Sequence, residues 1–334
     1  MRNVMTVDLE LVRRNVHACK SRLSGGVKLC AVVKADAYGH GAAMLSREIQ
    51  SDVDAFAVAL VEEGIELRIA GVLRPVLVLL PACAQEIERA LWYGLTLSVA
   101  TLGGLYAVER VARKMQTVAS VHFAVDTGMN RVGFTRQDRF LSACRYAASS
   151  PFVCLSGVFS HFSSAEQKVT EKQYATFRRR VALARKFAPE LTAHIAATPT
   201  FERQAYQEDM VRIGLALYGY GARGVQPVMT LTAKTISRRT VEGGARLLYA
   251  PAPNEKKRIK IVRVGYADGF LRSGNPAFCV PMAMDTAAVV GADRAPVEIL
   301  GKNRRADDIA RETGTIAYEV LVKASIRAER VYIT

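Results

Sequence analysis

Lys34 is the residue of this sequence whose type and position are best suited to chemistry. It directly follows the apolar, β-branched run 29–33, which predicts a buried strand, and Asp36, Gly39 and Gly41 then break the pattern as a loop does. Burial lowers the pKa of an amine, and a neutral amine can attack a carbonyl carbon to form a Schiff base. A single lysine at a strand end more often simply reaches into water, so its neighbours decide between the two interpretations.

The elements that must position Lys34 alternate between strand and helix over roughly the first two thirds of the chain. The predicted strands span 29–33, 55–60, 75–80, 95–99, 120–125, 152–159, 191–196 and 211–217. The predicted helices span 7–23, 41–48, 62–70, 84–93, 101–115, 137–148 and 166–187. This alternation predicts a parallel (β/α)8 barrel, and no GxGxxG motif follows a strand to favour an open dinucleotide-binding sheet. In such barrels the chemistry lies on loops after the strands, where Lys34, Arg131, His161 and Thr198 fall.

The pattern changes after Pro227. Short apolar runs follow at 229–236, 246–249, 259–264, 279–284, 297–300 and 321–326, with turn residues between them such as Gly243-Gly244 and the segment 274–276. We therefore expect a barrel domain over residues 1–226 and a mostly-β domain over residues 227–334, with one helix at 307–313. The first few residues of the chain are expected to be able to add a strand to the second domain.

Composition narrows the class of protein. Hydrophobic residues make up 50% of the 334, and no apolar run approaches the roughly 20 residues that span a bilayer. The N-terminus has no apolar stretch typical of a signal peptide, and no CxxC pair suggests a zinc site or a disulfide framework. We expect a cytoplasmic protein with no bound metal and with reduced, individually buried thiols. The cysteines are Cys19, Cys30, Cys83, Cys144, Cys154 and Cys279.

The net charge of +15 raises the question of nucleic-acid binding. The basic residues are scattered, however, with short clusters at 178–180, 256–258 and 302–305 that acidic residues separate. No interleaving of basic and aromatic residues is present. We therefore expect no nucleic-acid partner, and a basic surface can instead steer anionic ligands toward a site.

Five segments point to a family. The segment around Lys34, AVVKADAYGHG at 31–41, resembles the pyridoxal-phosphate (PLP) lysine motif of the alanine racemase family. Matches recur at 125–134, 157–162, 209–219 and 263–270, so the resemblance covers nearly the whole chain. It implies that Lys34 holds PLP as a Schiff base and acts as one acid/base. Tyr266, in the segment RVGYADGF, would be the second acid/base. Relatives insert this tyrosine from the partner subunit, so the resemblance implies a homodimer with shared active sites.

The resemblance also implies roles for the other site residues. Arg212 would face the pyridine nitrogen of PLP, and His161 would bridge Arg212 and the catalytic tyrosine. Arg131 would hold the substrate carboxylate and the phenolic oxygen of the cofactor, a task that suits the planar guanidinium fork. The backbone of Met284 would also meet that carboxylate. The phosphate would be bound by Tyr38, Thr198, Gly214 and Leu215.

Three positions depart from the family pattern. Ala124 stands where many relatives carry a lysine, often carbamylated, that orients the substrate arginine, so another group must position Arg131. A neighbouring side chain, His122 or Asn130, is one alternative to an anion or a water. Ala197 replaces an asparagine of the cofactor site. We assign Ile326 to the position of a tyrosine that touches the phosphate and narrows the entrance.

The expected function is therefore PLP-dependent interconversion of L-alanine and D-alanine, which in bacteria supplies D-alanine for peptidoglycan. One alternative is a racemase of broader or different preference, for serine or basic amino acids. Another is a non-catalytic PLP-binding protein, but those proteins lack the β domain and its tyrosine.

Overall fold

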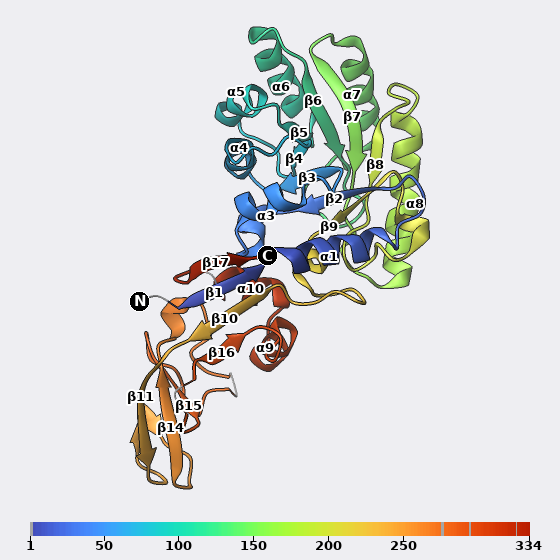
Figure 1. Ribbon diagram of the computed structural model, residues 1–334. Helices are drawn as coiled ribbons and strands as arrows, with labels where there is room; N and C mark the ends of the chain where they lie inside the picture. The colour runs from blue at the N-terminus through green and yellow to red at the C-terminus, as the bar shows by residue number, and fades with distance from the viewer. Residues whose placement is uncertain (1–2, 275–276, 294, 325) are drawn as a thin grey trace.

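A computed structural model describes residues 3–274, 277–293, 295–324 and 326–334 (Figure 1). Its largest sheet has eight parallel strands in the order β8-β7-β6-β5-β4-β3-β2-β9. The ends of this sheet meet, because the amide of Arg212 in β9 donates to the carbonyl of Ala196 just after β8, at 3.1 Å. This closure confirms the predicted (β/α)8 barrel. The strands are β2 (Lys28–Val32), β3 (Ala55–Val58), β4 (Val76–Val78), β5 (Thr96–Val99), β6 (Ala119–Ala124), β7 (Val153–Phe159), β8 (Thr192–His194) and β9 (Met210–Ile213).

Helices cover the outside of the barrel, with one departure from strict alternation (Figure 1). Between β8 and β9 the described chain contains the short turn η1 (Gln204–Tyr206) in place of a helix. The outer position beside β9 is taken by α1, which precedes the barrel and packs against η2 (Leu215–Tyr218). The buried Asn15 of α1 fixes this packing by donating to the carbonyl of Leu217 at 3.0 Å. The helices are α1 (Leu9–Lys20), α3 (Ala42–Ile49), α4 (Val61–Ile69), α5 (Ala84–Trp92), α6 (Leu102–Lys114), α7 (Gln137–Ser149) and α8 (Gln167–Ala184).

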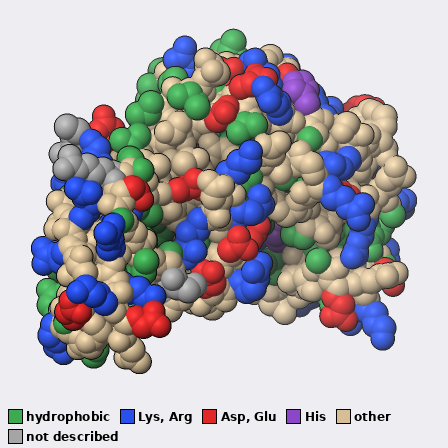
Figure 2. Space-filling view, turned by 60° about the horizontal axis from the view of Figure 1, so that its bottom comes forward, with side chains coloured by type: hydrophobic (Ala, Val, Ile, Leu, Met, Phe, Trp, Pro, Cys, Tyr) green, Lys and Arg blue, Asp and Glu red, His purple; other side chains and the backbone are tan. Residues whose placement is uncertain are grey.

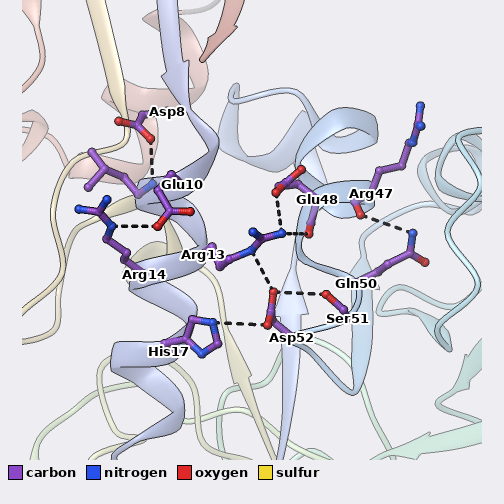
Figure 3. Close-up of polar contacts among 11 residues, drawn as sticks. Asp8, Glu10, Arg13, Arg14, His17, Arg47, Glu48, Gln50, Ser51 and Asp52 are labelled. Carbon is purple, nitrogen blue, oxygen red and sulfur yellow. Dashed lines mark hydrogen bonds and ion pairs between the residues drawn. The ribbon is translucent and has the colours of Figure 1, made fainter. Parts of the chain in front are cut away.

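A strand, β1 (Val4–Asp8), precedes the first helix of the described chain. The predicted helix 7–23 wrongly included the last two residues of this strand. Asp8 ends β1 and caps α1 by accepting a hydrogen bond from the amide of Leu11 at 2.8 Å, which stops the helix from starting earlier. The side chain of Arg13 then ties α1 to α3 through an ion pair of 2.7 Å with Glu48 (Figure 3). Helix α1 is therefore anchored both to the barrel wall and to the strand before it.

Strand β1 belongs to a sheet with the C-terminal part of the chain. It lies between β10 (Met229–Ala233), with which it is antiparallel, and β17 (Glu329–Ile333), with which it is parallel, and β16 (Val297–Leu300) completes the sheet. The expectation that the first residues add a strand here is confirmed. A second sheet, in the order β11-β14-β15, extends away from the barrel (Figure 1). Its strands are β11 (Thr235–Val241), β14 (Lys257–Val262) and β15 (Ala287–Val290), and β12 (Arg246–Leu247) pairs with β13 (Ala250–Pro251).

Two predictions for the C-terminal part are wrong. The run 321–326, predicted as a strand, lies mostly in α10 (Ala317–Ala324), whose buried residues recur at helical spacing; residue 325 lies outside the described part. Residues 279–284, all described, form no strand, and β15 follows them instead. The predicted helix at 307–313 is confirmed as α9 (Ala306–Thr313). Residues 275 and 276 of the predicted turn are not described, and the division at residue 226 remains our proposal.

Surface features complete the fold. No helix in the described part of the chain is long and apolar enough to cross a membrane. On the face drawn in Figure 2, lysine and arginine side chains are interspersed with acidic ones. Cys83 and Cys154 are exposed, which corrects the expectation that every thiol is buried.

Candidate active site

Eight of the ten predicted site residues line one cavity of about 570 Å³ at the carboxyl ends of the barrel strands. This is where a (β/α)8 barrel places its chemistry. Ala124 and Ala197 line the same cavity. Tyr266 and Met284 lie outside it. The eight residues are Lys34, Tyr38, Arg131, His161, Thr198, Arg212, Gly214 and Leu215.

Lys34 begins a tight left-handed turn in place of the predicted irregular loop. The residues that follow it, 35–38, have φ values from +50° to +53°, although none is glycine. Such a turn is strained and must be held by its surroundings. Glu63 of α4 accepts a hydrogen bond from the amide of Ala35 at 2.7 Å, and Asp36 forms an ion pair with Arg330 of β17. Elements from both parts of the chain thus fix the backbone next to Lys34.

The surroundings of Lys34 favour its neutral amine. Burial lowers the pKa of Lys34 below its usual value, and the positive charge of Arg131 lowers it further. Glu63 acts in the opposite direction but does not outweigh these effects. A neutral amine at this position has the nucleophilicity that Schiff-base formation requires.

A set of hydroxyl and amide groups lines the same cavity as Lys34. The Tyr38 hydroxyl comes so close to Gly214 that a Cβ at residue 214 would lie 2.7 Å from it, so only glycine fits there. The Thr198 hydroxyl accepts weak hydrogen bonds from the amides of Gly214 and Ala216, at 3.3 and 3.5 Å. Burial raises the pKa of Tyr38, which keeps its hydroxyl a donor at neutral pH. These groups can donate several hydrogen bonds to one anion.

The assignment of Ile326 to the phosphate-side tyrosine is wrong. Ile326 is 63% exposed and lines a separate cleft, whereas Tyr318 of α10 lines the active-site cavity. The ring of Tyr318 lies 5.6 Å from that of Tyr38. A tyrosine is therefore present at the cavity, and it is Tyr318 and not the residue at position 326 that lines it. The helical spacing of the apolar residues around Tyr318 was the available signal.

Arg212 lies at the floor of the cavity, almost fully buried. Its guanidinium donates to the carbonyl of Ser160 at 2.6 Å and contacts the Nδ1 atoms of His194 at 2.6 Å and His161 at 3.3 Å. Burial lowers the pKa of Arg212 to about 10, so it stays protonated at neutral pH. Burial and then the charge of Arg212 lower the pKa of His161 to about 3, so this ring is neutral. The prediction had not included His194, although it ends a barrel strand.

Arg131 is held by a turn after β6. The Asp126 carboxylate accepts hydrogen bonds from the amides of Gly128 at 2.8 Å and Asn130 at 3.1 Å. Ala124, at the end of β6, is 2% exposed and brings only a methyl group to the cavity. His122 forms a hydrogen bond with His194, with 2.8 Å between ring nitrogens. Its ring is therefore directed toward His194 and not toward Arg131. Of the two neighbours considered as substitutes for the missing lysine, His122 is thus a poor one.

Tyr266 and Met284 lie together on the surface. Tyr266 starts the turn η3 (Tyr266–Asp268) and is 39% exposed, while Met284 is 55% exposed. The amide of Ala267 donates to the carbonyl of Met284 at 3.0 Å, which joins the two segments. Within one chain these residues are separate from the cavity that contains Lys34.

Comparisons with known proteins agree over almost the whole chain. The family model described as the N-terminal domain of alanine racemase matches residues 7–222, and that of the C-terminal domain matches residues 228–332. An alanine racemase from Geobacter sp. (strain M21) is 33% identical, with 99% of this chain and 98% of that protein covered. The solved structure of alanine racemase from Clostridium difficile 630 matches with a TM-score of 0.93 at 29% identity, covering 100% of this chain and 96% of that one. Biosynthetic alanine racemase from Pseudomonas aeruginosa matches with a TM-score of 0.90 at 29% identity, covering 100% and 99%. The chain belongs to the alanine racemase family.

Proposed function

We propose that this protein interconverts L-alanine and D-alanine with PLP as its cofactor. Family membership makes it an amino-acid racemase, an isomerase. The observation that carries the proposal further is the convergence of Lys34, Arg212 and a set of hydroxyl and amide donors on one cavity. We further propose that it works in the cytoplasm and supplies D-alanine for cell-wall peptidoglycan.

The residues around the cavity fit PLP by their chemistry. The Lys34 amine, with its lowered pKa, suits the aldehyde, and the Tyr38 and Thr198 hydroxyls with the backbone near Gly214 suit the phosphate. Arg212 suits the pyridine nitrogen because it can donate a hydrogen bond there but releases its proton reluctantly. A donor that keeps its proton leaves the ring a weaker electron sink, which favours proton exchange over transamination.

Each protein group has a distinct task in the proposed mechanism. When bound through Lys34, PLP would supply an electrophilic carbon for the substrate amine and a ring that withdraws electrons from the α-carbon. Arg131 binds the substrate carboxylate and orients the α-carbon between two proton-transfer groups. The Lys34 amine removes or returns the α-proton on one face, and the Tyr266 hydroxyl does so on the other. Racemisation requires one such group on each face.

The position of Tyr266 supports a homodimer. Tyr266 and Met284 are exposed on the C-terminal part, outside the cavity that contains Lys34. We propose that each chain of a dimer inserts Tyr266 into the cavity of its partner, so that neither chain has a complete site alone. Met284 lies beside Tyr266 and would reach the same site.

A second candidate is a racemase with a broader preference, which Ala197 favours because it removes an amide donor and side-chain volume from the cavity. The test is a chiral assay of purified, PLP-loaded protein against alanine, serine, lysine and arginine. We expect alanine to be racemised with the highest kcat/KM. A higher value for serine or a basic amino acid would favour the second candidate, and turnover of none would contradict both.

Ala124 should leave Arg131 less firmly placed than in relatives that carry a lysine there. A displacement of about 1 Å in a positioning group can cost on the order of a hundredfold in rate. We expect wild-type turnover either to rise with added chloride, which can pair with Arg131, or to be low at every chloride concentration. An Ala124→Lys variant measured with bicarbonate, which can carbamylate the new amine, should remove the chloride dependence or raise turnover. Identical, chloride-independent rates for both proteins would show that this position has no anchoring role.

A further inference from the structure

A chain of three buried side chains runs through the interior of the barrel below the active-site cavity. Arg212 of β9 contacts His194 at the end of β8, with 2.6 Å between Nη1 and Nδ1. The other ring nitrogen of His194, Nε2, lies 2.8 Å from Nδ1 of His122 in β6. His194 is fully buried, and Arg212 and His122 are 4% and 8% exposed. His122 is therefore linked to Arg212 although it is not among the residues that line the active-site cavity.

The backbone between the two histidines is shaped for this contact. Strand β7 lies between β6 and β8, and Gly157 of β7 is the residue paired with His122. A Cβ at residue 157 would lie 2.6 Å from three atoms of the His122 ring. Glycine thus leaves the space in which the His122 ring reaches across β7 to His194. Phe159, two residues further along β7, stacks on His194 with ring centroids 5.3 Å apart.

Hydrogen-bond chemistry sets the direction of this chain. Arginine has no acceptor, so Nδ1 of His194 must accept the hydrogen bond from Arg212. Burial keeps both histidines neutral, because it lowers the pKa of His122 to about 3 and that of His194 well below its usual value. A neutral His194 that accepts at Nδ1 carries its proton on Nε2, and it donates that proton to Nδ1 of His122.

The far end of the chain reaches a second cavity at the opposite end of the barrel, whose lining includes hydroxyl and charged side chains. A neutral His122 that accepts at Nδ1 must carry its proton on Nε2. His122 lines this second cavity, of about 450 Å³, together with the hydroxyl residues Ser120 and Ser156. A cavity of that size with hydroxyl groups in its wall can hold water that accepts a hydrogen bond from Nε2–H. Every member of the chain can therefore be satisfied in one arrangement of tautomers.

We infer that His122 is a positioning residue for Arg212 that acts through the ring of His194. In the opposite tautomer, His194 would present an N–H to the Arg212 guanidinium at hydrogen-bond distance, which would push the guanidinium away. In the described residues no carboxylate pairs with Arg212, so its orientation depends on neutral acceptors such as this ring and the Ser160 carbonyl. The importance of this orientation for racemisation rests on the proposed function, whereas the tautomer chain is independent of it.

Nitrogen-15 NMR of the histidine rings in the wild-type protein tests the inference directly, with and without PLP. The chain has five histidines, so their signals can be assigned by single substitutions. We expect His194 as the neutral Nε2–H tautomer, with a scalar coupling across the hydrogen bond to Nδ1 of His122. His40 is an internal reference, because its Nδ1 lies 2.8 Å from the carbonyl of Ala37 and must carry the proton. An Nδ1–H tautomer at His194 would overturn the inference without any variant.

Two variants then separate positioning from simple packing. His122→Phe keeps the bulk but removes the acceptor, whereas His122→Asn keeps an acceptor near the position of Nδ1. We expect His122→Phe to give a mixture of His194 tautomers and to lower kcat about tenfold, as when a group that orients a functional ligand is removed. KM for alanine should change little, because Arg131 is unaffected, and His122→Asn should restore both the tautomer and most of kcat.

The outcomes distinguish this inference from the proposed function. If folded His122→Phe keeps a pure Nε2–H tautomer at His194 and full kcat, His122 does not position Arg212. If the tautomers shift as expected but the wild type racemises no amino acid, the hydrogen-bond chain stands and the proposed function fails. A His17→Gln variant, changed at an exposed histidine of α1, should leave the His194 signals unaltered.

Discussion

Replacing Lys34 with alanine should abolish racemisation, with a loss of at least about 10⁴-fold, the upper range for removing one general acid or base. The loss should exceed that of an ordinary site residue because Lys34 also anchors the cofactor. The measurement is kcat/KM for alanine in both directions with excess PLP. Borohydride reduction of the wild-type holoenzyme should fix the cofactor to the peptide that contains Lys34, and the variant should not be labelled.

Lys28 provides the matched control, because it begins β2, the strand that Lys34 follows, and is exposed. Lys28→Ala should retain wild-type activity and labelling at Lys34. Label on another lysine of the wild type, or appreciable activity in Lys34→Ala, would contradict the assignment. Circular dichroism should first show that the Lys34→Ala variant is folded, so that its loss of activity can be assigned to the missing amine.

The barrel could be predicted from sequence because its physical signal is strong. A parallel strand buried on both faces needs a continuous apolar run, and each such run from β2 to β9 is bounded by turn residues and followed by a different periodicity. The prediction contains no helix between the last two strands, which agrees with the structure, but it could not identify the segment that covers the barrel there. That place is filled by α1, a packing arrangement between segments about 200 residues apart, as the contact from Asn15 to Leu217 shows.

The errors in the C-terminal part have a common physical cause. The apolar run 321–326 contains β-branched residues and is short, so its periodicity alone did not separate strand from helix. Reading it as a strand hid α10, and with it Tyr318, which that helix carries into the active-site cavity. The resemblance alone placed the phosphate-side tyrosine at Ile326, which lies beyond the end of α10.

Local strain and tertiary contacts explain what was missed near the site. Four consecutive non-glycine residues with positive φ after Lys34 violate local preferences, and contacts from Glu63 and Arg330 hold them. The pairing of His194 with Arg212 likewise depends on barrel closure, since β8 and β9 become neighbours only there. Residue types and motifs could identify which side chains act, but not the contacts that orient them.

Mixing two inactive variants should restore activity if each active site is shared between two chains. In a heterodimer of Lys34→Ala and Tyr266→Phe chains, one cavity combines a normal Lys34 with a normal Tyr266 of the other chain, and the second cavity lacks both. Random exchange between equal amounts makes half of the dimers heterodimers, so activity should recover to about a quarter of the wild-type value. Each variant alone should be reduced at least about 10²-fold, because one proton-transfer group is missing.

The double variant, Lys34→Ala with Tyr266→Phe, should lower the activity of wild type when the two are mixed, whereas mixing the single variants should restore activity. When it is exchanged with wild type, each cavity of the heterodimer lacks one of the two groups, so a shared site predicts that equal mixing removes about half of the wild-type activity. If each site were built from one chain, the wild-type chain would keep full activity in the heterodimer. The exposure of Tyr266 outside its own cavity makes the first outcome the expected one. Exchange itself is verified by mass spectrometry of chains with different isotopic labels. An inactive mixture of single variants, together with an undiminished wild type in the second experiment, would show that Tyr266 completes a site within its own chain.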